Sequence, residues 1–378
     1  MKLLTPKIDR DSLFEKFAQI RRDLAASLIE RDEEIDLILT ALIAHEHVLP
    51  VGPPGCGKSL LLDSILQCVG GSKFSVLLTK FTTPEEVVGP VSLSALKDDR
   101  FVRVTTGKLP QVDFSFIDEV FKGSSAILNC LLKILNERVF DAGDGIAKAM
   151  PLKLCVGASN EWPLPETGKE LSALFDRFAL RKTVTPIRTH VGRQRLLWER
   201  SLTPKLSTSI TPMEVEAARR AAESLPWSPE AREALESIIK ELAREGIHPG
   251  DRRQRKTVGV VRAYAWLEGA EDVQPEHLEI AAHCLWDDPI EQPQKVAQVI
   301  AKVANPTGMR INQLLFEVEQ LIGPCDIHDL AEAAKAAAKL AEIERQLASL
   351  KGNGRLDRAR AYVREQLKKL KMASIEAI

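Results

Sequence analysis

The sequence predicts an α/β domain with a parallel, doubly wound sheet, followed by two helical regions. Short apolar runs of strand length alternate with helical patterns as far as about residue 185. Strand patterns cease from about residue 190, where helix-start motifs take over. Near the C-terminus, apolar residues recur every three or four positions on both sides of a glycine-containing turn. We therefore expect domains at residues 1–189, 190–288 and 289–378.

The first domain begins with two helices and continues with alternating strands. Leu13 to Leu28 and Ile35 to Leu42 carry apolar residues at helical spacing, separated by a charged break. Each predicted strand is a short apolar run that suits a buried parallel strand. These runs are His47 to Val51, Phe74 to Thr79, Phe114 to Ile117, Leu152 to Ala158 and Ala179 to Val184.

Two segments interrupt the alternation of strands and helices. Val88 to Leu109 and Val139 to Met150 contain glycine and aspartate among short apolar pairs. This pattern is typical of hairpins, and both are predicted as inserts in the sheet domain. Inserted loops on such a scaffold are common sites of partner contact.

The second domain is predicted to be all-helical. A capping box with proline at the first helical position begins at Thr211, and similar helix starts follow at Ser228 and Gln274. A helical stretch then leads to the tail, where Leu340 to Leu350 and Leu356 to Leu370 keep the helical period around a turn. The tail is predicted as an antiparallel helical hairpin, either packed on itself or serving as a docking arm. Its second half is basic, as in a solvated helix face or a contact with an acidic partner or nucleic acid.

The composition is that of an ordinary globular protein. Of 378 residues, 44% are hydrophobic and 28% are charged, and the net charge is −1. This balance excludes a global field that would draw the whole molecule to nucleic acid or an anionic membrane. Six cysteines without a Cys-x-x-Cys pair argue against a zinc site and favour a reducing compartment. Neither a signal peptide nor an apolar run of about 20 residues is recognisable, so we expect a cytoplasmic protein without a membrane span.

A phosphate-binding loop connects the first strand to the next helix. Its glycines let backbone N–H groups approach phosphate oxygens, and the helix N-terminus adds positive partial charge. Lys58 is expected to reach the outer phosphates, and the Ser59 hydroxyl to ligate Mg²⁺. A thiol within this loop could make binding sensitive to oxidation, or simply fill space. The loop and the residue after it are Gly52, Pro53, Pro54, Gly55, Cys56, Gly57, Lys58, Ser59 and Leu60.

Four further polar residues lie beside later strands. Asp118 and Glu119 end a buried strand, where Asp118 can hold the Mg²⁺ shell and Glu119 can polarise the attacking water. Asn160 follows another strand and can orient water without adding negative charge. Arg177 comes just before the last strand, from where it could reach a nucleotide bound by a neighbouring subunit.

In this order and at these intervals, the motifs resemble the Walker A, Walker B, sensor 1 and arginine-finger elements of AAA+ ATPases. The two hairpin inserts, together with Phe81 to Pro90, Ile134 to Arg138 and Ser159 to Glu161, resemble more narrowly the MoxR family and its RavA-like branch. The resemblance covers about residues 28–288. It implies an AAA+ domain with a five-stranded sheet and an all-α lid, ATP and Mg²⁺ as cofactors, and hexameric rings with ATP at subunit interfaces.

The resemblance also implies partners and further site residues. MoxR-like proteins often work with a protein that carries a von Willebrand factor A domain, in chaperone-like remodelling or maturation of protein complexes. A sensor 2 arginine is expected at the start of a lid helix, and both Arg252 and Arg253 are candidates, with Arg252 favoured. Adenine is expected near Glu30 to Ile35.

Two other functions are compatible with the same fold. The first is a nucleic-acid-dependent motor, but the chain contains no recognisable helix-turn-helix or zinc module, so we do not expect nucleic acid as a partner. The second is a scaffold that ATP switches without hydrolysis. The presence of Asp118, Glu119 and Asn160 argues against it, because a pure switch need not keep hydrolytic groups.

Overall fold

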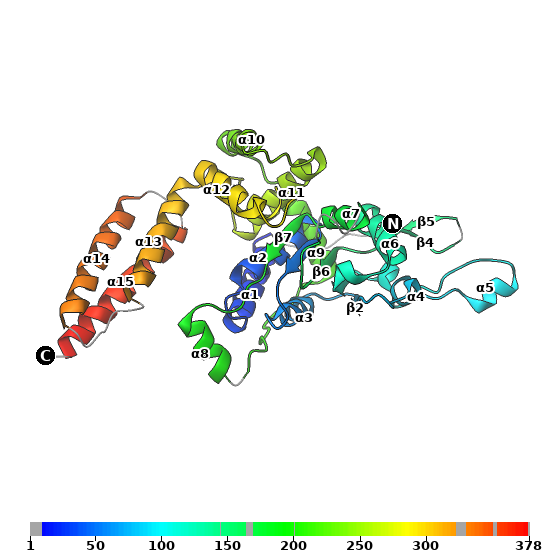
Figure 1. Ribbon diagram of the computed structural model, residues 1–378, viewed down its shortest axis with the longest axis horizontal. Helices are drawn as coiled ribbons and strands as arrows, with labels where there is room; N and C mark the ends of the chain where they lie inside the picture. Colours follow the sequence, from blue (N-terminus) through cyan, green and yellow to red (C-terminus); the bar gives the residue numbers. More distant parts are fainter. Residues whose placement is uncertain are drawn as a thin grey trace.

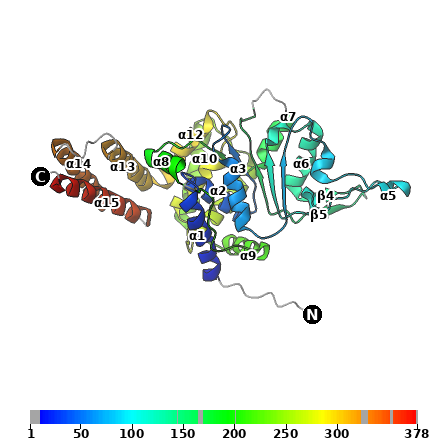
Figure 2. The same cartoon turned by 90° about the horizontal axis from the view of Figure 1, so that it is seen from below.

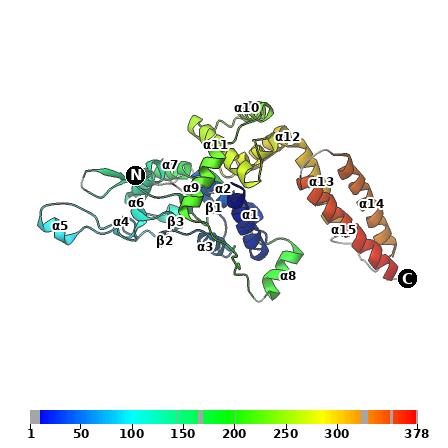
Figure 3. The same cartoon turned by 180° about the vertical axis from the view of Figure 1, so that it is seen from behind.

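The computed structural model describes residues 10–143, 145–163, 169–199, 201–322, 330–350 and 354–376. Figure 1 shows an elongated molecule with a central α/β body, several lid helices above it, and the short helix α8 (His190–Trp198) below it. A bundle of the last helices lies at one end, and an arm that carries the short helix α5 (Leu93–Lys97) lies at the other. The view from behind separates the same parts (Figure 3).

Five parallel strands in the described residues form one sheet with the order β2-β3-β6-β1-β7. Val48 of β1 lies opposite Val156 of β6 on one side and Leu180 of β7 on the other. The carboxyl ends of β1, β3 and β6 therefore meet at one edge of the sheet, and the predicted α/β fold is confirmed. The strands are β1 (Val48–Val51), β2 (Lys73–Leu77), β3 (Phe114–Asp118), β6 (Leu154–Gly157) and β7 (Leu180–Thr183).

Helices cover this sheet because their apolar stripes pack against it and against each other. The two predicted N-terminal helices are present, and α2 packs against β1, β7 and the lid helix α11. α6 packs against α7, which brings the end of α7 near the last strand. The helices of the body are α1 (Arg10–Ser27), α2 (Asp32–Ala44), α3 (Lys58–Cys68), α6 (Ser125–Glu137) and α7 (Lys169–Arg177).

Both inserts project from the same end of the body (Figure 2). β4 (Val139–Asp141) and β5 (Ala147–Ala149) form the predicted antiparallel hairpin. The other insert, predicted as a hairpin, follows α4 (Pro84–Val88). Its strand-like pairing within the described residues is a single bridge between Val91 and Arg103, and it carries the short helix α5 (Leu93–Lys97), which was not predicted. The backbone N–H of Arg103 donates to the carbonyl oxygen of Ala142 at 2.7 Å, so the two inserts are joined.

The lid is helical, as predicted, and its helix starts follow the sequence signals. Thr211 and Glu214 form the predicted capping box of α9, and the Ser228 hydroxyl caps α10. One apolar cluster contains residues from Leu13 to Ala304, so α12 shares the core of the body and the lid. The domain boundaries at residues 189 and 288 stay predictions. The elements are α8 (His190–Trp198), α9 (Pro212–Glu223), α10 (Pro229–Arg244), α11 (Asp251–Leu267), the 3₁₀ helix η4 (Pro275–His283) and α12 (Gln292–Ala304).

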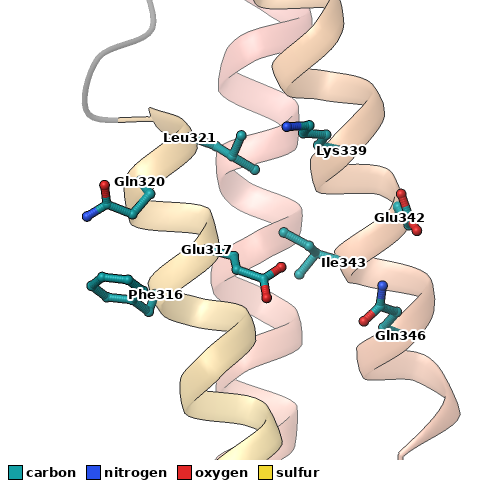
Figure 4. Close-up of a pocket in the computed structure, with 8 residues that line it drawn as sticks. All are labelled: Phe316, Glu317, Gln320, Leu321, Lys339, Glu342, Ile343 and Gln346. Carbon is teal, nitrogen blue, oxygen red and sulfur yellow. The ribbon is translucent and has the colours of Figure 1, made fainter.

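The C-terminal helices form a separate bundle with its own apolar core. α14 (Leu330–Ser349) and α15 (Gly354–Glu376) form the predicted hairpin. α13 (Pro306–Ile322) lies in the predicted helical stretch before the tail, and its packing as a third helix of the bundle was not predicted. Between α13 and α14 lies a groove of about 350 Å³ whose lining includes Phe316 and Ile343 (Figure 4). Even the longest helices in the described parts of the chain are too short or too polar to cross a bilayer.

Candidate active site

The phosphate loop lies between β1 and α3 and is shaped by two glycines. Gly57 has a φ of +80°, a conformation that L side chains rarely adopt, and it caps the N-terminus of α3. At Gly52 a Cβ atom would lie 2.1 Å from the carbonyl oxygen of Val184, so a larger residue cannot fit beside β7. The N–H of Gly52 donates to the carbonyl oxygen of Ser159 at 3.1 Å. The loop is thus fixed to the strands on both sides of β1.

Arg31, which the sequence analysis did not single out, holds the tip of this loop. Its side chain is buried, and one Nη atom donates to the carbonyl oxygens of Cys56 and Thr185, both at 2.9 Å. The other Nη atom donates to the carbonyl oxygen of Glu30 at 2.7 Å. These charge-assisted bonds join the loop to the start of α2 and to the chain after β7.

Three predicted site residues, at the start of α3 and in the turns after β3 and β6, are joined by hydrogen bonds. Lys58 is 8% exposed, and its Nζ donates to the carbonyl oxygen of Gly52 at 2.5 Å and to Oδ1 of Asn160 at 2.9 Å. The Nδ2 of Asn160 donates to Oε1 of Glu119. Asn160 therefore joins the ammonium of the phosphate loop to the carboxylate that follows β3.

The carboxylates after β3 occupy different environments. Glu119 has a φ of +51° and is 8% exposed, and its N–H donates to Oδ1 of Asp118 at 2.9 Å. Lys122 lies 3.0 Å from Oε1 of Glu119, whereas Oε2 is buried without a hydrogen-bond partner among the described residues. Asp118 is half-buried at the end of its strand. A buried carboxylate oxygen that lacks a donor is suited to accept a hydrogen bond from a bound water.

The residues fit a magnesium-bound nucleoside triphosphate. Ser59 and Leu60 are exposed in the first turn of α3, and the space around the Gly55 and Gly57 backbones is open, with no atom within 4 Å of a Cβ built there. Backbone N–H groups at a helix N-terminus suit phosphate oxygens, and the hydroxyl and carboxylate oxygens of Ser59 and Asp118 suit Mg²⁺. Pro53 and Pro54 are exposed, while Cys56 is buried, with Sγ 3.9 Å from Lys58 Nζ.

A hollow adjoins the loop at the segment expected to meet adenine. It has a volume of about 560 Å³ and lies between the start of α2 and the chain after β7. Arg31 lines it and also contacts the loop at Cys56. Burial works to raise the pKa of Glu30, but hydrogen bonds from Thr189 and Arg188 outweigh it and lower the pKa. The residues that line the hollow are Glu30, Arg31, Asp32, Glu33, Glu34, Lys182, Thr183, Thr185 and Arg188.

Arg177 lies apart from this hydrogen-bonded chain. It is the last residue of α7, and its side chain is 21% exposed. Its Nη1 lies 3.3 Å from Oδ2 of Asp176, and its Nε is buried without a hydrogen-bond partner among the described residues. In the described part of the chain, Arg177 therefore contacts Asp176 and has no hydrogen bond to the phosphate loop.

The two sensor 2 candidates at the start of α11 differ sharply. Arg253 is 5% exposed; it is ion-paired with Asp176 and with Asp287, the latter at 3.1 Å, and donates to the carbonyl oxygen of Cys284 at 3.1 Å. Burial raises the pKa of Asp287, although Arg253 opposes this shift. Arg252 is exposed. Only Arg252 thus presents its guanidinium to solvent.

Sequence reasoning missed the polar and aromatic residues that hold these parts together. Arg181 on β7 is fully buried, with its guanidinium 3.9 Å from the ring centre of Phe175 and its Nη1 2.6 Å from the carbonyl oxygen of Trp286. An arginine inside a strand-like run is a usable signal, because burying a charge requires compensation. Arg31 gave no such signal, since it lies in a charged break between helices.

Comparisons with known proteins agree with this arrangement. Residues 15–217 match the family described as "MoxR domain in the MoxR-vWA-beta-propeller ternary systems", and residues 231–300 match an AAA lid domain. The chain is 36% identical to an uncharacterised protein of Methanocaldococcus jannaschii over 96% of this chain and 91% of that protein. It is 24% identical to chaperone MoxR1 of Mycobacterium tuberculosis over 38% and 39% of the two chains. The crystal structure of a proposed ATPase from Cytophaga hutchinsonii has the same fold, with a TM-score of 0.63, 16% identity and coverage of 78% of this chain and 96% of that one.

Proposed function

Because the chain belongs to the MoxR family of AAA+ ATPases, we propose that it hydrolyses ATP at the phosphate loop and uses the energy to remodel protein complexes. The observation that carries this proposal is the contact chain from Lys58 through Asn160 to Glu119. Along the sequence, Lys58 and Asn160 are 102 positions apart, and Asn160 and Glu119 are 41 positions apart. A scaffold that only binds ATP would not need a carboxylate and an amide beside the phosphate loop.

Each residue has a role that follows from its chemistry. Lys58 would exchange its present carbonyl and amide acceptors for phosphate oxygens. Ser59 and Asp118 would hold Mg²⁺, which supplies neutralisation of phosphate charge when bound. Glu119 would accept a hydrogen bond from the attacking water through its unpaired Oε2, while Asn160 keeps the carboxylate in place through Oε1.

The arginines extend the site beyond one subunit. We assign sensor 2 to Arg252, because Arg253 is buried in ion pairs and Arg252 is free to move to phosphate. Arg177 would act on the nucleotide of the next subunit in a ring, which we propose to be a hexamer. A guanidinium at that position stabilises the charge that develops during phosphoryl transfer.

The family description supports a partner with a von Willebrand factor A domain, because its members occur in systems that contain such a protein. The name of the mycobacterial relative supports a chaperone-like role. We therefore propose that the substrate of the motor is a protein complex rather than nucleic acid. The joined inserts at one end of the body, formed by α5 and the β4–β5 hairpin, are placed to contact it (Figure 1).

The test is ATP hydrolysis per subunit over a wide range of protein concentration. We expect a specific rate that rises and then saturates, because assembly completes each site with Arg177. Lys58→Ala should abolish nucleotide binding in an isothermal titration. Arg177→Ala should keep binding and lose turnover by about 10³-fold.

Arg220→Ala is the matched control, because Arg220 is an exposed arginine whose ion pair lies within helix α9. It should hydrolyse ATP like the unaltered protein. A ring that forms with ATP but never releases phosphate would contradict the proposal and support the switched scaffold. Turnover that needs DNA, with a steep salt dependence, would support a nucleic-acid motor instead.

A further inference from the structure

The carboxylate of Asp176 lies between two arginines of different domains. Its Oδ2 is 3.3 Å from Nη1 of Arg177, on the same helix, and its Oδ1 accepts a hydrogen bond from Nη2 of Arg253 in the lid. Asp176 is 45% exposed, whereas Arg253 is almost fully buried. One acidic side chain thus joins the end of α7 to the start of α11.

Arg253 is fixed on the lid side of this contact. Asp287 and the carbonyl oxygen of Cys284, both near the end of the lid sequence, each lie 3.1 Å from its guanidinium. A buried guanidinium with three acceptors has little freedom, because any movement would leave its charge uncompensated. Arg252 precedes it on the same helix, so a rigid movement of α11 displaces both arginines.

Arg177 has no comparable support of its own. Its Nε is buried without a partner among the described residues, and its one ion pair there is with Asp176. The direction of the guanidinium therefore depends on the Asp176 carboxylate. If that carboxylate shifts with Arg253, Arg177 shifts as well.

Aromatic packing makes this junction stiff. The centre of the Phe175 ring lies 5.9 Å from the ring centre of Trp162 and 6.0 Å from that of Trp286. The ring centres of the two tryptophans are 5.5 Å apart. Trp162 comes two residues after Asn160, and Trp286 immediately precedes Asp287. The last turn of α7 is therefore packed between the loop that carries Asn160 and the end of the lid.

We propose that Asp176 is a positioning residue that directs Arg177 toward the neighbouring subunit and couples it to the lid through Arg253. This inference rests on the proposed action of Arg177 across the subunit interface. It predicts that the lid, by moving Arg252 and Arg253 together, sets how each subunit presents Arg177 to the next one.

The test uses mixed assemblies of two inactive full-length variants. Lys58→Ala subunits cannot bind nucleotide but can present Arg177, and Arg177→Ala subunits bind nucleotide but present no arginine. Mixing them should restore ATP hydrolysis. Adding Asp176→Asn to the Lys58→Ala subunit should then lower the restored rate roughly 10- to 100-fold, because a misdirected group loses its effect on the transition state. Adding it to the Arg177→Ala subunit should change the rate less than about twofold.

Comparing Asp176→Asn on the Lys58→Ala subunit with Asp176→Asn on the Arg177→Ala subunit separates a positioning role from a general structural role. The substitution is the same in both mixtures, but only the first subunit presents Arg177. Equal losses in both would overturn the inference. Asp176→Glu on the Lys58→Ala subunit should recover part of the rate, because it keeps the charge. If Asp176→Asn has no effect in either placement, the inference is wrong while the action of Arg177 across the interface stands. If the parent mixture shows no restored activity, that action is itself wrong, and the positioning role fails with it.

Glu46→Gln provides a matched control for attachment of the lid. Lys256, one turn after Arg253 on α11, lies 2.5 Å from a carboxylate oxygen of Glu46 in the body. This ion pair also joins α11 to the body but does not involve α7. The Glu46→Gln substitution should give the same restored rate in both placements. A difference between its placements like that of Asp176→Asn would mean that any weakening of lid attachment is sufficient, and would overturn the inference.

Discussion

The nucleotide edge of the sheet and the C-terminal bundle are built from opposite kinds of buried side chain. At the edge, Lys58, Asn160 and Glu119 are held by hydrogen bonds to one another and to the backbone. In the bundle, Leu340 and Val363 are fully buried among apolar neighbours. Hydrogen bonds between buried polar groups add little to the net stability of the fold but fix the geometry of the groups. Buried leucines add more to stability, and other apolar side chains of similar volume can replace them. Changes at the edge should thus appear in turnover, and changes in the bundle should appear in unfolding.

The largest effect is expected for Glu119→Gln. The amide can still contact Asn160, but it is a poor acceptor for a proton from water, so turnover should fall about 10²- to 10⁴-fold. ATP binding and the unfolding midpoint should stay close to those of the unaltered protein. Single-turnover hydrolysis, titration with ATP and thermal unfolding measure the three quantities.

Glu161→Gln is the control for that measurement. Glu161 lies one residue after Asn160 and is exposed, and its backbone N–H and carbonyl oxygen share hydrogen bonds with the Ser159 hydroxyl. Its turnover should be unaltered. Near-normal turnover in Glu119→Gln would remove Glu119 from its proposed role and place the edge with the purely structural regions.

The next effect is expected in the bundle. Leu340→Ala should lower the free energy of unfolding of the bundle by about 2–5 kcal/mol, because it leaves a cavity where the side chain was fully buried. ATP turnover should change less than about twofold, since the bundle core is separate from the core of the body. Amide hydrogen exchange in α13, α14 and α15 of the full chain measures the loss.

Phe316→Ala is the matched control in the same bundle. Phe316 is 60% exposed at the groove between α13 and α14, so its removal should cost less than about 1 kcal/mol. If Leu340→Ala instead lowered turnover as strongly as it lowered stability, the two regions would be energetically coupled, and the comparison would fail.

The two regions also differ in how far the sequence predicted them. All five strands, both inserts and the hairpin of α14 and α15 follow from apolar spacing and turn residues, because these patterns are local. Helix α13 was not recognised as part of the bundle, since its burial depends on contacts with segments far along the chain. At the edge, the motif residues were found because their chemistry dictates their order along the sequence.

The sequence could not tell Arg252 from Arg253, since adjacent arginines differ only in what the fold places beside them. Asp176, Asp287 and the carbonyl of Cys284 come from distant segments, and together they compensate the charge of Arg253. For Arg181, its place in a strand-like run was a usable signal, but its aromatic neighbours Phe175 and Trp286 meet only in the folded chain. Long-range compensation of charge is the part of the site that residue patterns do not reveal.

The smallest effect is expected for Arg31→Lys. Arg31 is a buried residue outside the phosphate loop that holds the loop through hydrogen bonds. Lysine keeps the charge but cannot bond the carbonyl oxygens of Glu30, Cys56 and Thr185 at once, because it lacks the planar fork of arginine. The loop should lose part of its support, and ATP affinity should fall about tenfold, which corresponds to about 1.4 kcal/mol. Arg22→Lys, an exposed arginine on α1, is the control and should bind ATP normally. Unchanged affinity in Arg31→Lys would mean that the loop keeps its shape without this anchor, so that the geometry of the edge arises from Lys58, Asn160 and Glu119 alone.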